Sequence, residues 1–397
     1  VMTDWFAGAD AVKQMQAGND LLMPGTQSQQ QALLNAARKG QLDVQVLDRN
    51  IERILDLIMR TRTFRHEPVS NKPDLDAHAQ ISRKAATEGM VLLKNERDAL
   101  PLAAGKKLAI FGNSAHDIII GGTGSGDVHE AYSVALPEGL ENAGYATDKA
   151  LSQAYAEHIE AAKAHRPETN PFLAPPPLPE LVPTAEQIGA AVAANDVGVI
   201  TIGRNSGEFI DRKAEGDFYL TEAEQTLIMN VSAAFHKAGK PVVVVLNVGG
   251  VIEVASWRDQ VDAILLAWQP GQEAGHAMAD VLSGKVNPSG KLTDTFALDL
   301  KDYPAAENFP GVTLLGPDPA ARGGIVINDR AAEVEYRDDI WVGYRHFNTR
   351  DFDVAYPFGY GLSYTRFKYR DLKLTREDAG FTASVIVTNT GRRAGKE

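Results

Sequence analysis

The run Val197-Gly198-Val199-Ile200-Thr201-Ile202 decides the fold, because mainly apolar residues with this share of β-branched side chains are typical of a buried strand. A helical stretch follows at 221–238 and opens with Thr221-Glu222-Ala223-Glu224, a capping-box pattern. A second apolar run, at 242–246, comes directly after that helix. Strand, helix and strand in this order predict part of a parallel sheet.

The same alternation extends in both directions along the chain. Further strand candidates lie at 91–93, 108–111 and 263–267, and further helices are expected at 77–89 and 273–282. We therefore predict the α/β class, with an α/β sandwich domain over 77–300 whose mainly parallel sheet is covered on both faces. The proline-rich stretch 166–183 fits neither helix nor central strand and is expected to be a surface excursion.

The flanking segments are of other kinds. Residues 1–64 are expected to be a strand end followed by helices, one at 27–39 and a longer one with a single apolar face. That face consists of Val44, Leu47, Ile51, Ile54, Leu55 and Ile58. We predict a linker at 65–76, an irregular interface segment at 301–366 and the start of a β-sandwich at 367–397.

Composition excludes several functions. The net charge is −12, and the 40 Lys and Arg residues are scattered, so we expect no nucleic acid partner. The absence of cysteine excludes disulfides and thiolate metal sites, and no apolar stretch reaches the roughly 18 residues of a membrane span. The compartment stays open, with a periplasmic or secreted location favoured over the cytoplasm.

Two carboxylates are the candidate catalytic residues. Asp4 and the aromatic Trp5 end an apolar run at the start of the chain, which is typical of a barrel strand that presents a nucleophile to a sugar. Glu208, in Ser206-Gly207-Glu208, follows a glycine that lets the backbone approach a ligand closely. The alternatives are that Asp4 caps the next helix and that Ser-Gly-Glu is an ordinary turn.

The glycine-rich loop at 121–127 resembles a phosphate cradle, but no Gly-Lys-Ser/Thr follows it. We expect it to line a polar substrate cleft, with Ser125 as a substrate-binding candidate, or to be a structural turn. Arg204 is a second substrate-binding candidate. Together with Asp211 and Arg212 it either holds the Glu208 loop through ion pairs or forms a solvated charge cluster.

Scattered histidines do not suggest a metal site. His116, His129 and His276 lack metal-ligand spacing, so we predict no metal and no cofactor.

Taken in order, a series of short motifs resembles glycoside hydrolase family 3, the β-glucosidase family. These motifs are Thr3-Asp4-Trp5, Ala17-Gly18-Asn19-Asp20, Met23-Pro24-Gly25, Glu88-Gly89-Met90-Val91-Leu92-Leu93-Lys94-Asn95, Ser206-Gly207-Glu208, Trp268-Gln269-Pro270-Gly271-Gln272-Glu273, Ser289-Gly290-Lys291-Leu292 and Phe358-Gly359-Tyr360-Gly361-Leu362-Ser363-Tyr364. An ordered series across nearly the whole chain is far more specific than any one motif.

This resemblance implies a (β/α)8-type barrel, an α/β sandwich and a fibronectin type III-like domain, with residues 1–64 as a remnant of the barrel. It implies retaining double displacement, with Asp4 as nucleophile, Glu208 as acid/base and Trp5 as a platform for the sugar. The implied substrate is an oligosaccharide or a simple β-glucoside. Since most of the barrel and part of the last domain are missing from 1–397, we expect a fragment that is inactive alone.

Other hypotheses stay open beside β-glucosidase activity. β-Xylosidase or another exo-glycosidase of the family is one, because the absent barrel sets sugar identity. A non-catalytic carbohydrate-binding or assembly module is another, and a nucleotide-binding protein is the third. The sequence does not decide whether the protein forms a homo-oligomer.

Overall fold

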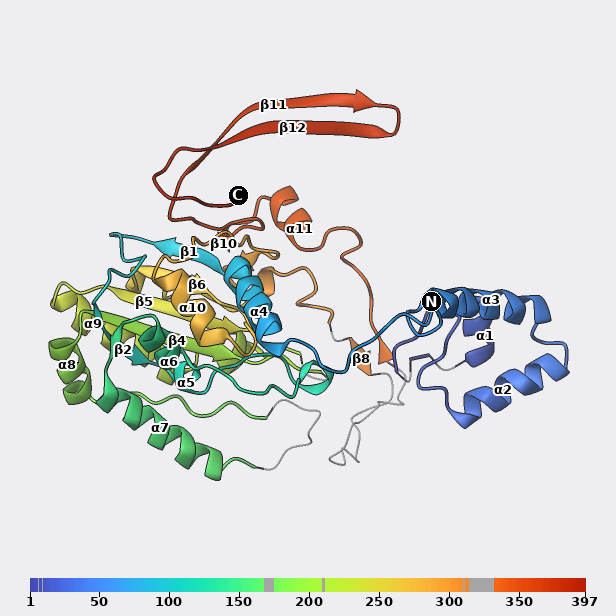
Figure 1. The fold of residues 1–397 in the computed structure, drawn as a ribbon, viewed down its shortest axis with the longest axis horizontal. Helices are drawn as coiled ribbons and strands as arrows, with labels where there is room; N and C mark the ends of the chain where they lie inside the picture. The colour runs from blue at the N-terminus through green and yellow to red at the C-terminus, as the bar shows by residue number, and fades with distance from the viewer. Residues whose placement is uncertain (6, 9, 168–174, 209–210, 310, 314–331) are drawn as a thin grey trace. The chain divides into compact units, whose positions relative to one another are not determined.

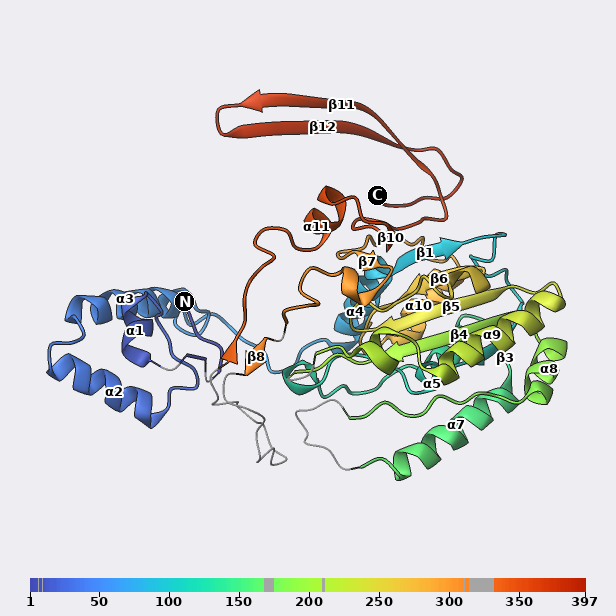
Figure 2. The same cartoon turned by 180° about the vertical axis from the view of Figure 1, so that it is seen from behind.

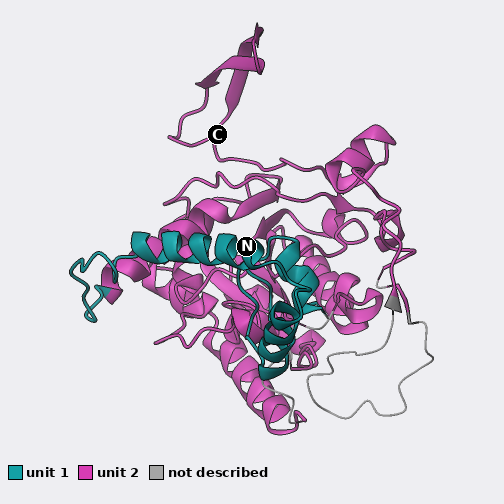
Figure 3. Ribbon diagram, turned by 90° about the vertical axis from the view of Figure 1, so that its right-hand side faces the viewer, with its two compact units in different colours: residues 1–74 teal, residues 75–397 magenta. Residues whose placement is uncertain are grey.

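The computed structural model describes residues 1–5, 7–8, 10–167, 175–208, 211–309, 311–313 and 332–397. These residues form two compact units, Val1–Asp74 and Leu75–Glu397, coloured separately in Figure 3. Part of the predicted excursion, 168–174, and much of the predicted irregular segment, 310 and 314–331, lie outside the described residues. The predicted domain boundaries stay predictions.

The first unit is helical. It contains α1 (Ala11–Gln16), α2 (Gln27–Arg38) and α3 (Val44–Arg60), and residues Met2 and Leu21 form an isolated parallel bridge. Each helix begins at a side-chain cap, which satisfies backbone N–H groups that have no partner inside the helix. The caps are Asp10, Thr26 and Asp43. The small core consists of Ala11, Met15, Leu22, Ala36 and Leu42.

Helix α3 is attached to this unit through Asn50 and through the partly buried Val46 and Leu47. Its one buried residue is Asn50, whose side-chain amide donates to the carbonyl oxygens of Met15 at 3.3 Å and Asn19 at 3.1 Å. Much of the predicted apolar face is exposed, at Val44, Ile51, Leu55 and Ile58. The periodicity therefore predicted the helix correctly, but an apolar face alone does not reveal what it packs against.

A six-stranded sheet forms the centre of the second unit (Figure 1). Its strands are β1 (Val91–Asn95), β2 (Lys107–Phe111), β3 (Ala146–Thr147), β4 (Val197–Arg204), β5 (Val242–Val248) and β6 (Ala263–Leu266), in the order β1-β6-β5-β4-β2-β3. All neighbours are parallel except β1 and β6. The predicted α/β class with a mainly parallel sheet is confirmed.

Helices cover both faces of this sheet, as Figures 1 and 2 show from opposite sides. One core cluster contains side chains of α7 (Lys149–Ala164), α8 (Ala185–Ala194) and α9 (Glu222–Lys237). The other contains side chains of α4 (Leu75–Gly89), α5 (Asn113–His116), α6 (Leu136–Asn142) and α10 (Ala274–Leu282). In β5 alternate apolar residues enter opposite clusters, which explains why 242–246 is an unbroken apolar run.

Shorter antiparallel pairs follow the sheet. They are β7 (Phe296–Ala297) with β10 (Val354–Tyr356), β8 (Val312–Thr313) with β9 (Ala332–Glu333), and β11 (Phe367–Glu377) with β12 (Gly380–Asn389). Helix α11 (Tyr344–Thr349) precedes β10. Among the described residues, no helix is both long and apolar enough to cross a bilayer.

Candidate active site

The sheet reverses its order beside β2, and this reversal locates the candidate site. The chain passes through β2, β3 and β4 in turn, yet β3 and β4 lie on opposite sides of β2. In open parallel sheets, ligands bind at such a switch point, outside the carboxyl ends of the strands. The segment after β2 contains the glycine-rich loop at 121–127, and the loop after β4 contains Glu208.

Glu208 contacts the glycine-rich loop directly. The backbone N–H of Ser125 donates a hydrogen bond of 2.9 Å to Oε1 of Glu208. Gly124 makes room for this contact, because a Cβ atom there would lie 3.0 Å from both Cγ and Cδ of Glu208, and its φ of +71° favours glycine. The anion on this loop is therefore a carboxylate of the protein itself, which weakens the nucleotide-binding hypothesis.

The backbone just before Glu208 is held by the same loop. The N–H of Thr123 donates to the carbonyl oxygen of Ser206 at 2.9 Å, and the Ser206 hydroxyl donates to Oε1 of Gln269 at 3.0 Å. Gly249, after β5, lies against this segment, since a Cβ atom there would be 2.6 Å from Cβ of Ser206. Ser206-Gly207-Glu208 is thus packed and hydrogen-bonded on several sides, unlike an ordinary exposed turn.

Arg204 ends β4 and is buried beneath the Glu208 loop. Its Nη1 and Nη2 atoms bond to the two carboxylate oxygens of Glu224 at 2.5 and 2.7 Å, and its Nε donates to the carbonyl oxygen of Asp217 at 2.8 Å. These contacts give Arg204 a role in positioning the loop. Its predicted contact with substrate, like that of the Ser125 side chain, stays a prediction.

Two other charged residues of this region were predicted to hold the loop. Arg212 does form an ion pair with Asp217, which also accepts a hydrogen bond from the backbone N–H of Lys213 at 3.0 Å. Asp211 is exposed. The predicted ion-pair support is thus present at Arg204 and Arg212.

Asp4 and Trp5 lie in the first unit, on an exposed segment before α1. The carboxylate of Asp4 accepts a hydrogen bond of 2.7 Å from the backbone N–H of Trp5, whose indole is 63% exposed. The alternative that Asp4 caps the next helix is wrong, because Asp10 caps α1. Since Glu208 belongs to the second unit, the pairing of the two catalytic candidates stays a prediction.

Sequence reasoning missed a partly buried acid near Arg204 and Glu224. Both carboxylate oxygens of Glu180 accept from the backbone N–H of Asn113, at 3.0 and 3.2 Å. Burial raises the pKa of Glu180 to about 8, and the nearby Glu224 carboxylate adds to the rise. Glu180 lies in the proline-rich excursion, where nothing in the local sequence indicates an acid that bonds to the start of α5.

Two of the three histidines singled out in the sequence pack against named neighbours. His116 stacks on Tyr155 with ring centroids 5.0 Å apart, and burial lowers the pKa of His116 to about 4. The Nδ1 atom of His276 lies 2.8 Å from a carboxylate oxygen of Glu273. Within the described ranges, no group of three or more His, Cys, Asp and Glu side chains is arranged to hold a metal ion.

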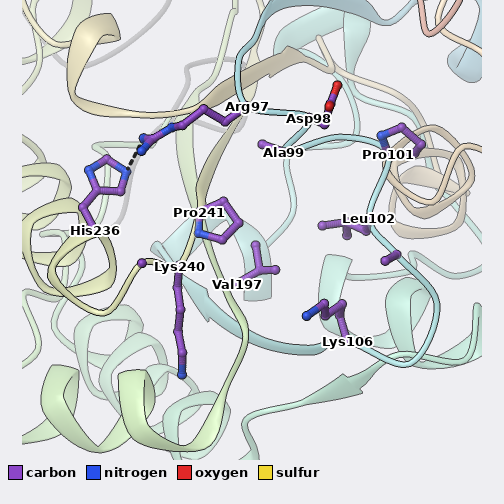
Figure 4. Close-up of a pocket in the computed structure, with 12 residues that line it drawn as sticks. Arg97, Asp98, Ala99, Pro101, Leu102, Lys106, Val197, His236, Lys240 and Pro241 are labelled. Carbon is purple, nitrogen blue, oxygen red and sulfur yellow. Dashed lines mark hydrogen bonds between the residues drawn. The ribbon is translucent and has the colours of Figure 1, made fainter.

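A cavity of 230 Å³ lies at the opposite, amino-terminal ends of β4 and β5 (Figure 4). Arg97 and His236 from its wall both bond to the buried carboxylate of Asp262. The Nζ atom of Lys240 donates to the carbonyl oxygens of Val192 and Asn195. Because these side chains already have partners, the cavity offers little to a charged ligand, and the Glu208 region remains the candidate site.

Comparison with known proteins identifies similar sequences over most of the chain. Residues 90–364 match the family model described as the glycosyl hydrolase family 3 C-terminal domain. The chain is 38% identical to β-glucosidase A of Butyrivibrio fibrisolvens, over 81% of this chain and 41% of that protein. It is 34% identical to thermostable β-glucosidase B of Acetivibrio thermocellus, over 100% of this chain and 48% of that protein.

A solved structure is similar over the whole chain. It is β-glucosidase 3B of Thermotoga neapolitana in complex with α-D-glucose, with a TM-score of 0.89 and 42% identity, covering 100% of this chain and 54% of that one. The chain therefore spans about half the length of the relatives it matches.

The family model and these relatives together place the chain in the class of the glycoside hydrolase families. Within this class the chain belongs to glycoside hydrolase family 3, which confirms the resemblance found in the sequence.

Proposed function

We propose that the protein, in its full-length form, is a retaining exo-β-glycosidase that removes terminal β-D-glucosyl residues from oligosaccharides or simple glucosides. The observation that carries this proposal is the carboxylate of Glu208, presented at the switch point of the sheet on the backbone N–H of Ser125. The β-glucosidases among the relatives support the choice of sugar.

In the proposed reaction, a carboxylate oxygen of Asp4 attacks the anomeric carbon while Glu208 gives its proton to the leaving glycosidic oxygen. Water then attacks the same carbon, Glu208 takes a proton from that water, and the bond to Asp4 breaks. Retaining catalysis needs the two carboxyl groups about 5–5.5 Å apart when substrate is bound. In this scheme the Trp5 indole packs against the sugar, and Ser125 and Arg204 are the further candidates for contact with substrate.

The backbone contact at Glu208 orients its carboxylate, because the N–H of Ser125 donates to Oε1. The first step needs a proton on Glu208 and the second needs a free carboxylate oxygen that takes a proton from water. We expect the contact with Ser125 to lengthen when substrate enters, as the loop adjusts to the leaving oxygen.

A second sugar is supported by another pair of relatives. The chain is 32% identical to proteins named exo-α-(1→6)-L-arabinopyranosidase from Bifidobacterium breve and Bifidobacterium longum, over 98% of this chain in both cases. L-Arabinopyranosides therefore belong in the substrate panel beside β-glucosides and β-xylosides.

The test is hydrolysis of 4-nitrophenyl glycosides by the full-length protein. We expect Asp4→Asn and Glu208→Gln each to reduce β-glucoside hydrolysis by about 100-fold to 10,000-fold, the range for loss of a positioned acid, base or nucleophile. Asp10→Asn and Glu215→Gln are matched controls, each a few residues from a catalytic candidate. If activity survives Asp4→Asn or Glu208→Gln undiminished, that residue is not catalytic.

The stereochemistry of the first product tests the mechanism separately. Proton NMR of early product should show the β anomer of the sugar, because two inversions at one carbon amount to retention. A full-length protein that binds the glycosides without cleaving any of them would instead support a non-catalytic carbohydrate-binding module.

A further inference from the structure

Gln269 lies between the two loops that meet at Glu208. It follows β6 and the residue Trp268, which has a φ of +55°. The carbonyl oxygen of Trp268 accepts a hydrogen bond of 2.8 Å from the side-chain amide of Asn247, which is fully buried at the end of β5. The backbone leading to Gln269 is therefore fixed by the sheet.

The carboxamide of Gln269 bonds to both loops. Its Oε1 accepts from the hydroxyl of Ser206 at 3.0 Å. Its Nε2 donates to the carbonyl oxygen of Gly121 at 3.2 Å and to Oδ1 of Asn205 at 3.1 Å. An amide group is well suited to this place, because it both accepts and donates within one planar group.

These bonds involve residues that lie a few positions before Glu208 and Ser125 in the sequence. Ser206 is two residues before Glu208, and Gly121 is four residues before Ser125. Asn247 holds the same glycine-rich segment further back, since its amide oxygen accepts from the backbone N–H of Ile119 at 2.8 Å and its amide nitrogen donates to the carbonyl oxygen of Ile119 at 2.8 Å. Removing the Gln269 amide would loosen both sides of the contact at once.

The side chains around Gln269 are closely packed, so the two loops have little room to move. A Cβ atom on Gly249 would lie 3.0 Å from Cδ of Gln269 and 2.6 Å from Cβ of Ser206. The next residue, Gly250, differs, because a Cβ atom there would first meet the flexible end of Arg212 at 3.2 Å. The two adjacent glycines therefore form a matched pair for substitution.

We propose that Gln269 is a positioning residue for Glu208, because it fixes the Glu208 loop against the glycine-rich loop. Its effect on catalysis rests on the proposed acid/base role of Glu208. Gln269 does not take part in proton transfer. Its loss leaves the sugar site in place but displaces the acid from the leaving oxygen, and displacement of this kind lowers kcat far more than it raises KM.

Amide hydrogen exchange in the 397-residue chain tests the positioning role without any need for activity. The backbone amides of Thr123 and Ser125 both donate across the contact. In Gln269→Ala and in Gln269→Met, which keeps the side-chain volume, we expect these two amides to exchange about tenfold faster, because each variant loses three hydrogen bonds. The amides of β5 should be unchanged, which shows that the sheet is intact.

Two comparisons sharpen this measurement. Gly249→Ala should speed exchange at Thr123 and Ser125, whereas Gly250→Ala and the exposed-helix variant Gln153→Ala should not. If Gln269→Met restores wild-type exchange while Gln269→Ala does not, side-chain volume rather than hydrogen bonding holds the loops. Unchanged exchange at Thr123 and Ser125 in both variants overturns the positioning role.

Kinetics of the full-length protein test the consequence for catalysis. We expect Gln269→Met to lower kcat for 4-nitrophenyl β-glucoside about 10-fold to 100-fold while KM changes about threefold or less. A loss confined to KM would assign Gln269 to substrate binding and contradict the proposal. If the unmodified full-length protein cleaves no glycoside, the proposed function fails, and the exchange experiment still decides whether Gln269 positions the loop.

Discussion

Arg204 and Glu224 form a two-bond ion pair at the root of the loop that carries Glu208, with both side chains at least 93% buried. Glu224 is also the third residue of α9, where its Oε2 accepts from the backbone N–H of the cap residue Thr221 at 2.8 Å. One carboxylate therefore joins the end of β4 to the start of α9. The loop that carries Glu208 therefore leaves the sheet from a fixed point.

Arg204→Met should destabilise the second unit strongly. The substitution leaves Glu224 buried without its cation, and breaking a buried pair in this way typically costs about 3–5 kcal/mol of unfolding free energy. Urea unfolding followed by circular dichroism measures the loss. Arg337→Met is the control, because Arg337 and its partner Glu335 are both largely exposed and such pairs contribute about 0–1 kcal/mol. Equal losses in the two variants would contradict the structural role of Arg204.

The same substitution, glycine to alanine, should have opposite effects at two helical positions. A Cβ atom on Gly139 in α6 would lie 2.1 Å from the backbone of Gly275 in α10, so Gly139→Ala has to separate these helices. We expect it to cost on the order of 1–3 kcal/mol, as for an overpacked core. Gly189 in α8 is exposed, and an added Cβ atom there would have nothing within 4 Å, so Gly189→Ala should stabilise by about 0.5–1 kcal/mol through helix propensity.

Thermal unfolding of both glycine variants provides the check. A lower midpoint for Gly139→Ala beside a higher one for Gly189→Ala agrees with the structure. If Gly139→Ala were as stable as the unmodified chain, α6 and α10 would not approach each other at this glycine.

Glu180 should make stability depend on pH between about 4.5 and 8. Its pKa is raised in the folded state from 4.5 to about 8, so its contribution to stability is complete below pH 4.5 and is lost as the pH rises through 8. The charged groups facing it are Glu224, which raises this pKa, and Arg204, which lowers it. Since one pKa unit corresponds to about 1.36 kcal/mol, the loss is on the order of a few kcal/mol.

Glu180→Gln removes the titrating group while keeping its size. We expect this variant to gain stability relative to the unmodified chain as the pH increases from 5 to 8.5, measured as urea midpoints at several pH values. Glu186→Gln, at an exposed position in the first turn of α8, should show a difference that does not vary with pH. A constant difference for Glu180→Gln as well would mean that Glu180 titrates normally.

Sequence reasoning identified five of the six strands of the sheet, but it did not predict β3, α7 or α8. The runs that became β2, β4 and β5 are apolar on both faces, and Thr221 and Glu224 do form the predicted capping box of α9. These features depend on neighbours in sequence, so a local pattern contains the information. The motif Ser206-Gly207-Glu208 was likewise recognised as a candidate from its own residue types.

The contacts that hold Glu208 could not be predicted in this way. Gln269 meets Gly121, 148 residues away, and Glu180 meets Asn113, 67 residues away. Such pairs arise from strand order, which depends on the path of the whole chain. The exposed face of α3 is a similar case, because its periodicity specifies an apolar surface but not the partner.

The glycine-rich loop offers one more matched pair of substitutions. Gly124 has a φ of +71°, and a Cβ atom there would lie 3.0 Å from Cγ and Cδ of Glu208, whereas a Cβ atom on Gly126 would have nothing within 4 Å. Gly124→Ala should therefore strain the loop by about 1–3 kcal/mol and displace Glu208. We expect β-glucoside hydrolysis by the full-length protein to fall about tenfold or more in Gly124→Ala and to change little in Gly126→Ala, because only the first substitution moves the proposed acid. Both variants should keep the circular dichroism spectrum of the unmodified protein, since the loop lies outside the sheet. Equal activity in the two variants would show that the contact between Glu208 and this loop has no part in catalysis.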